Sequence, residues 1–75
     1  MQKVKKMSLL ELSKTLIGHK VRFISDCEFF PNFDVTCNVK QIYMKGNEMI
    51  IEVNTLNNKH LTIGSNMKNL QFELL

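Results

Sequence analysis

The sequence predicts a small, mainly β domain: one N-terminal amphipathic helix followed by a five-stranded, strongly bent antiparallel sheet. Three observations predict this α+β fold class. Apolar residues recur at helical spacing only near the start of the chain, over residues 8–17. After residue 18 they alternate with polar residues, as they do in strands that bury one face. Short glycine- or asparagine-containing segments separate the alternating runs, which is typical of hairpins.

The size of the chain sets the domain organisation. Its 75 residues, 44% of them hydrophobic, suit a single domain over residues 1–75 with one core. No apolar run approaches the roughly 20 residues that cross a bilayer, and the basic start lacks the cleavage pattern of a secretion signal. We therefore expect a cytoplasmic protein without a membrane partner.

The first element is expected to be a helix over residues 8–17, preceded by a disordered basic tail over residues 1–6. Ser8 and Glu11 give the S-x-x-E pattern of a capping box, and Gly18 supplies a C-terminal stop. The apolar stripe that should cover the sheet consists of Leu9, Leu12 and Leu16, flanked by Leu10 and Ile17.

The first two strands follow from alternation. Residues 19–25 form the first, with Val21 and Phe23 inward. In the second, the inward series is Phe33, Val35, Cys37 and Val39, and after a break at Lys40–Gln41 it becomes Ile42 and Met44. A phase change within one long strand indicates a β-bulge or a sharp bend.

The rest of the chain continues as a meander. A turn at residues 45–47 contains Gly46, which is free to take a positive φ. The next strand carries Met49, Ile51 and Val53 inward, and a second turn covers residues 56–59. A short strand at residues 61–63, one tight helical turn within residues 64–69 and a final strand at residues 70–74 complete the order.

This order resembles an SH3-like barrel, which has a long first loop, a three-strand meander and a 3₁₀ turn before the fifth strand. With its leading helix, it is also similar to the layout of Sm-like RNA-binding proteins. The resemblance covers most of the chain and concerns element order. It implies a small β-barrel formed by residues 19–75, and we use it for the fold and not for function.

The sequence contains little that favours catalysis or cofactor binding. His19 and His60 stand at strand starts with no nearby carboxylate or nucleophile, and Glu28 and Asp34 are interpreted as solvated loop carboxylates. We expect no enzyme, no catalytic residue, no cofactor and no small-molecule substrate.

The two cysteines are interpreted as packing thiols. Cys27 and Cys37 lack the closely paired spacing of structural zinc ligands, so we expect no metal site. Without a secretion signal, both are expected to be reduced.

Nucleic-acid binding is the first functional hypothesis. The net charge is +3, and the candidate phosphate ligands are Lys20, Arg22, Lys40, Lys45, Lys59 and Lys68. With a single arginine, binding should be weakly sequence-specific, and Phe29 or Phe30 would stack on unpaired bases. A charged surface that only keeps the protein soluble is the alternative.

The abundance of lysine and asparagine, which AT-rich codons encode, suggests a bacterial, phage or mobile-element source.

Protein binding is the rival hypothesis. The segment at residues 27–34, CEFFPNFD, carries Phe29, Phe30 and Pro31 between two strands, as an apolar anchor for a protein partner would. That partner is either a host factor that the protein modulates or a second copy in a homo-oligomer, for which an open sheet edge would also serve. Phe33 is assigned to the core, and one of Phe29 and Phe30 is expected to plug the barrel while the other is exposed.

Overall fold

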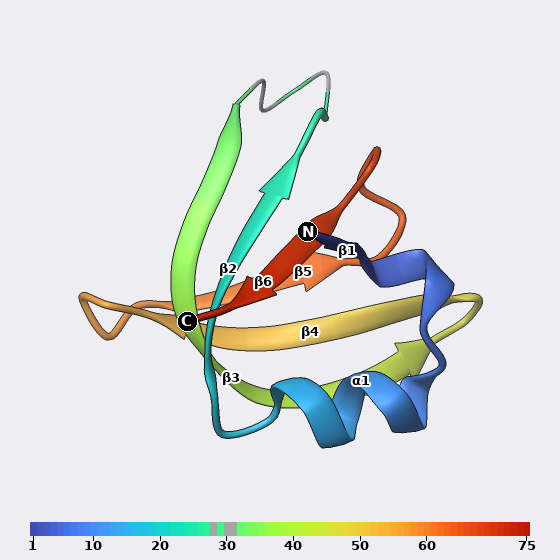
Figure 1. Ribbon diagram of the computed structural model, residues 1–75, viewed down its shortest axis with the longest axis horizontal. Coiled ribbons are helices and arrows are strands. Elements are labelled where there is room, and N and C mark those ends of the chain that lie inside the picture. The colour runs from blue at the N-terminus through green and yellow to red at the C-terminus, as the bar shows by residue number, and fades with distance from the viewer. Residues whose placement is uncertain (28, 30–31) are drawn as a thin grey trace.

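The alternating runs of the sequence pair into one antiparallel sheet (Figure 1). The computed structural model describes residues 1–27, 29 and 32–75, and within these the sheet has six strands in the order β1-β6-β2-β3-β4-β5. The strands are β1 (Gln2–Lys3), β2 (Lys20–Ser25), β3 (Phe33–Lys45), β4 (Glu48–Thr55), β5 (His60–Gly64) and β6 (Gln71–Leu74). The helices of this part are the 3₁₀ helix η1 (Val4–Lys6) and α1 (Leu9–Leu16).

The sheet is bent but open. In the described part of the chain β1 and β5 form its two edges, and no strand pairing joins them. A closed barrel is therefore not confirmed, and the expected strand count of five becomes six. The additional strand comes from the N-terminus.

Residues 1–6, expected to be a disordered tail, are ordered. Gln2 pairs with Phe72, and the Val4 N–H donates to the Leu70 carbonyl at 3.0 Å. The Val4 side chain is fully buried in the core. A single apolar residue among lysines thus anchors the segment, and its burial offsets the entropy cost of ordering it.

The helix follows the prediction closely. The Glu11 N–H donates to Ser8 Oγ and the Ser8 N–H donates to a Glu11 carboxylate oxygen, both at 3.2 Å, which confirms the capping box. Gly18 takes a φ of 84° just after the helix, a conformation that favours glycine. Leu12 and Leu16 are fully buried where α1 packs against β3 (Figure 1).

The long strand β3 bends at the predicted place. Its register shifts between Val39 and Gln41, so the phase break in the sequence is a β-bulge. The first half of β3 pairs with β2 and the second half with β4 (Figure 1). Ile42 lies inside as expected, but Met44 is 47% exposed, so its assignment to the core was wrong.

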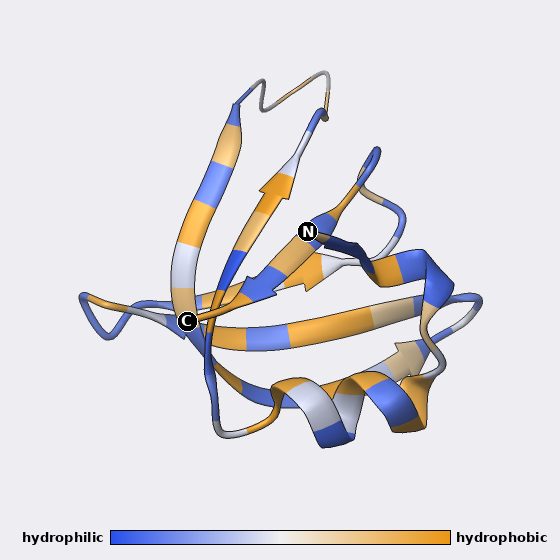
Figure 2. Cartoon of the chain, viewed as in Figure 1, coloured by the Kyte–Doolittle hydropathy of each residue, from blue (hydrophilic) through white to orange (hydrophobic). Residues whose placement is uncertain are grey.

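The core is formed by the inward residues of every strand except β1, by the buried face of α1, and by Val4 of η1 and Leu70 before β6. Polar and apolar bands alternate along β3 in Figure 2, as one-sided burial requires. The core residues are Val4, Leu12, Leu16, Val21, Phe23, Cys37, Val39, Ile42, Ile51, Val53, Ile63, Leu70 and Phe72. Phe33 is half-buried and packs at the margin of this cluster.

In the described ranges, no helix has the length and apolar character needed to span a bilayer.

The connection between β5 and β6 differs from the expected single helical turn. It forms two successive turns, closed by the Met67 N–H to the Gly64 carbonyl at 3.1 Å and by the Leu70 N–H to the Met67 carbonyl at 3.3 Å. The 3₁₀ helix occurs instead at the N-terminus, as η1.

Candidate nucleic-acid interface

A row of polar side chains crosses four strands on the outer face of the sheet. The register places Lys20 opposite Asn38, Asn38 opposite Asn54, and Asn54 opposite His60. Residues directly opposite each other in a sheet share a face, and here the alternate residues on the other face are the buried ones. Because neighbouring strands lie about 4.8 Å apart, the row is about 14 Å long. We call these four residues the polar row.

Two more lysines flank the polar row. Lys40 is the residue at the β3 bulge, directly after the strand segment that carries Asn38, and it is exposed. Lys59 precedes His60 at the start of β5 and is also exposed. With Lys20, three of the six predicted phosphate ligands therefore surround one strip of the outer face.

Glu52 is a carboxylate beside the polar row, and it is held by neighbouring side chains. The Gln41 amide donates to Glu52 Oε1 at 2.7 Å. This bond, then one from the Tyr43 hydroxyl, lowers the pKa of Glu52, and the charges of His60 and Lys40 contribute further. The same contact raises the pKa of Tyr43. Glu52 is thus an anion held by two neutral side chains of β3.

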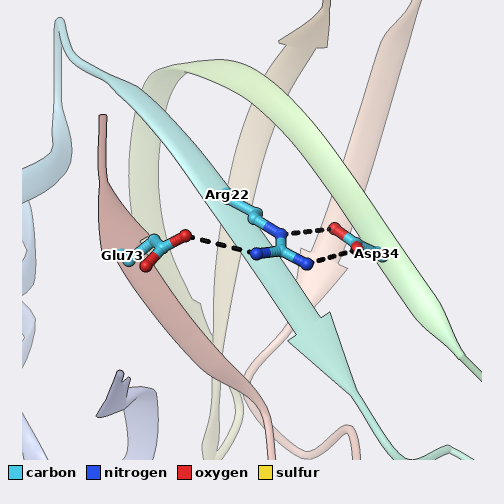
Figure 3. Close-up of polar contacts among 3 residues, drawn as sticks. All are labelled: Arg22, Asp34 and Glu73. Carbon is cyan, nitrogen blue, oxygen red and sulfur yellow. Dashed lines mark hydrogen bonds and ion pairs between the residues drawn. The ribbon is translucent and has the colours of Figure 1, made fainter.

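Arg22, one of the predicted phosphate ligands, is bound to two carboxylates within the fold. Its Nε and Nη2 donate to the two carboxylate oxygens of Asp34 on β3 at 2.9 and 2.7 Å, and Nη1 donates to Glu73 on β6 at 3.3 Å (Figure 3). These bonds raise the pKa of Arg22 and lower that of Asp34. One guanidinium between two carboxylates leaves no positive charge for an external phosphate.

The remaining two lysines lie away from the polar row. Lys45 ends β3 at its far hairpin, opposite Glu48. Lys68 lies between β5 and β6, where its carbonyl accepts bonds from the Asp26 N–H at 3.0 Å and from Ser25 Oγ at 2.7 Å. Because Ser25 ends β2 and Lys20 begins it, Lys68 stands at the opposite end of that strand.

The aromatic loop is also remote from the polar row. Phe29 is 86% exposed, whereas Phe30 and Pro31 lie outside the described residues, as does Glu28. The loop follows β2, whose six residues span about 17 Å from Lys20. Phe29 is therefore too far away to stack on a base held at the polar row.

The cysteines and histidines do not converge on a reactive centre in the described residues. Both cysteines are free, and Cys37 is fully buried with Sγ 3.6 Å from the Val21 carbonyl. Burial raises the pKa of the Cys37 thiol to about 11, so it is a poor nucleophile at neutral pH. Within the described ranges, no group of three or more His, Cys, Asp or Glu side chains is placed to hold a metal ion.

Sequence reasoning missed Asn38, Asn54 and Tyr43 as members of this surface. The signal was present, because all three occupy outward positions in the alternating strands.

Comparison with protein-family models, curated proteins and solved structures gives no match.

Proposed function

We propose that the protein is a non-enzymatic module that binds single-stranded nucleic acid on the outer face of β2, β3, β4 and β5, with weak sequence specificity. The observation that carries this proposal is the polar row with lysines around it. Lys20, Lys40 and Lys59 supply positive charge to phosphates. Asn38 and Asn54 supply amide donors and acceptors to sugars and base edges.

The geometry favours an unpaired strand over a duplex. A sheet surface with amide and imidazole groups is suited to bases that are not already paired. Reading a duplex in its major groove relies most often on arginine, and the single arginine of this chain is bound to Asp34 and Glu73. Weak sequence preference follows from the same absence of a free guanidinium.

We extend the proposal to the class of fold. The order β6-β2-β3-β4-β5, the long first connection and the bulge in β3 support an open variant of the SH3-like or Sm-like small barrel, with β1 added at the edge. A bacterial or phage origin and a cytoplasmic location complete this proposal, on the compositional grounds given above.

The test is binding of labelled single-stranded oligonucleotides as a function of salt. The logarithm of the association constant should fall linearly with the logarithm of salt concentration. Three lysine–phosphate contacts predict a slope of about −2 or steeper. The triple variant Lys20→Gln, Lys40→Gln, Lys59→Gln should lose most of the affinity and most of the slope.

A matched control removes the same charge elsewhere. The variant Lys5→Gln, Lys14→Gln, Lys68→Gln changes the net charge equally but leaves the polar row intact. It should keep nearly all the affinity. Equal losses in the two triple variants, or no binding by the wild type at low salt, would contradict the proposal.

Phe29 favours a second candidate function, which is binding of a protein partner. A phenylalanine that is 86% exposed has the character of an interface anchor. The expected partner is a host protein or another copy of the chain. Capture from nuclease-treated lysate by the wild type but not by Phe29→Ser would support it, and equal capture by both would remove Phe29 from the argument.

A further inference from the structure

Tyr43 lies on the outer face of β3, beyond the bulge. It pairs with Ile50 on β4, and Gln41 and Lys45 occupy the outward positions before and after it on the same strand. The Tyr43 side chain is accessible, with 38% of the residue exposed, and Ile50 is a half-buried neighbour on the same face. The face therefore presents one aromatic ring supported by an apolar neighbour.

The Tyr43 hydroxyl interacts with the Glu52 carboxylate on β4, and this contact raises the pKa of Tyr43. The Gln41 amide donates to the same carboxylate at 2.7 Å. Stacking on a base uses the face of an aromatic ring and does not need the hydroxyl.

Cationic residues lie on both sides of Tyr43 along β3. Lys40 precedes it at the bulge and Lys45 follows two residues later, about 7 Å further along the strand. Among the described residues the ion pairs are those of Arg22, so neither lysine has a carboxylate within 4.0 Å.

The carboxylate opposite Lys45 is directed elsewhere. Glu48 Oε2 accepts the Asn66 N–H at 3.1 Å. The same carboxylate lies over Gly64 so closely that a side chain at Gly64 would collide with it. Lys45 therefore keeps its charge available to an external anion.

We propose that Tyr43 stacks on one unpaired base, with Lys40 and Lys45 binding phosphates on either side of that nucleotide. This inference rests on the proposed function, and it extends the interface from the polar row along the second half of β3. It replaces Phe29 as the stacking ring, because Phe29 follows the other end of β2 whereas Tyr43 lies three residues after Lys40 on β3. Stacking on an aromatic face tolerates any base, consistent with weak specificity.

The sequence provides a direct probe of this contact. The chain has one tyrosine and no tryptophan, so tyrosine emission reports on Tyr43 alone. Titration with unlabelled oligothymidylate and oligoadenylate should quench this emission in step with binding, after correction for absorbance with free N-acetyltyrosinamide. Saturable binding that leaves the emission unchanged would overturn the inference.

Two variants separate the ring from its hydroxyl. Tyr43→Leu should weaken oligonucleotide binding about 10-fold with the salt slope unchanged, whereas Tyr43→Phe, which keeps the ring, should bind nearly as the wild type does. Lys45→Gln should reduce the magnitude of the salt slope by about 0.7, and Lys68→Gln should not change it.

The outcomes distinguish this inference from the proposed function. Wild-type affinity in a folded Tyr43→Leu variant would overturn the stacking role, while sensitivity to the Lys20, Lys40 and Lys59 triple substitution would still support the polar row. Absence of any oligonucleotide binding would overturn both. If Tyr43→Leu fails to fold, the wild-type quenching and the Lys45→Gln slope still decide the result.

Discussion

At the scale of single residues, Arg22 takes its role from the two carboxylates that face it. It joins β2 to β3 through Asp34 and to β6 through Glu73 (Figure 3). The bidentate geometry with Asp34 is one that lysine cannot reproduce. The ion pair therefore links three neighbouring strands, and its loss should be felt as a pH-dependent change in stability.

We predict that this linkage weakens in acid. Arg22 holds the pKa of Asp34 below its ordinary value of 3.8, so the pair stabilises the fold above that pH. The contribution is lost as pH falls through the lowered pKa, because protonated Asp34 no longer attracts the guanidinium. Urea denaturation should show wild type more stable than Asp34→Asn at about pH 7, with the difference closing toward about pH 2.

Two controls sharpen the experiment. Arg22→Lys should lose part of the stabilisation at neutral pH, and neither variant should alter the salt slope of oligonucleotide binding. A reduced slope in Arg22→Lys would show that the guanidinium does contact phosphate. A constant difference between wild type and Asp34→Asn across the pH range would contradict the linkage.

The sequence could not show that Arg22 is ion-paired within the fold. Alternation within 19–25 correctly places Arg22 on the outer face of a strand. It does not reveal which residues stand opposite, and Asp34 and Glu73 are 12 and 51 positions away in the chain. For the same reason, the sequence suggests Lys20, Lys40 and Lys59 as phosphate ligands. It does not show that these three lie around one strip of the sheet while Lys45 and Lys68 lie elsewhere.

At the scale of elements, strong local patterns in the sequence were sufficient to predict where α1 begins and where β3 bends. The capping box predicted the start of α1, and the broken alternation at Lys40–Gln41 predicted the bulge in β3. The two-residue strand β1 was missed because two residues show no periodicity, and because the three lysines of residues 1–6 resemble a solvated tail. Met44 was misassigned because the alternation continues to the end of β3 beyond the edge of the core.

Because Val4 anchors η1, we predict that its side chain contributes to the free energy of unfolding. Replacing this fully buried side chain with alanine should destabilise the protein by about 2 kcal/mol, at the low end for a large-to-small core substitution. Chemical denaturation measures the effect. The exposed neighbour is the control, since Lys5→Ala should change stability by less than about 0.5 kcal/mol. Equal stability of Val4→Ala and wild type would mean that residues 1–6 are not anchored in solution.

At the scale of the whole molecule, the two candidate contact surfaces are far apart. The polar row crosses the sheet at the end of β2 that contains Lys20, and Phe29 follows the opposite end of β2. Substitutions at one surface should therefore leave the other unaffected, since distant sites contribute additively.

This separation is testable in a single protein. Phe29→Ser should leave oligonucleotide affinity within about twofold of wild type, and the Lys20, Lys40 and Lys59 triple variant should retain any protein partner captured through Phe29. A large loss of oligonucleotide affinity in Phe29→Ser would mean that a single ligand contacts both ends of β2, which would require a strand longer than the polar row.

The pairing of β1 with β6 has a consequence for the order of folding. Hairpins β3–β4 and β4–β5 close short loops, whereas Gln2 and Phe72 come from opposite ends of the 75-residue chain. Contacts between distant segments carry the largest loop-closure entropy, so they form after the local ones. The meander should therefore be in place before the two chain ends meet, and β1 should detach first when the fold begins to open.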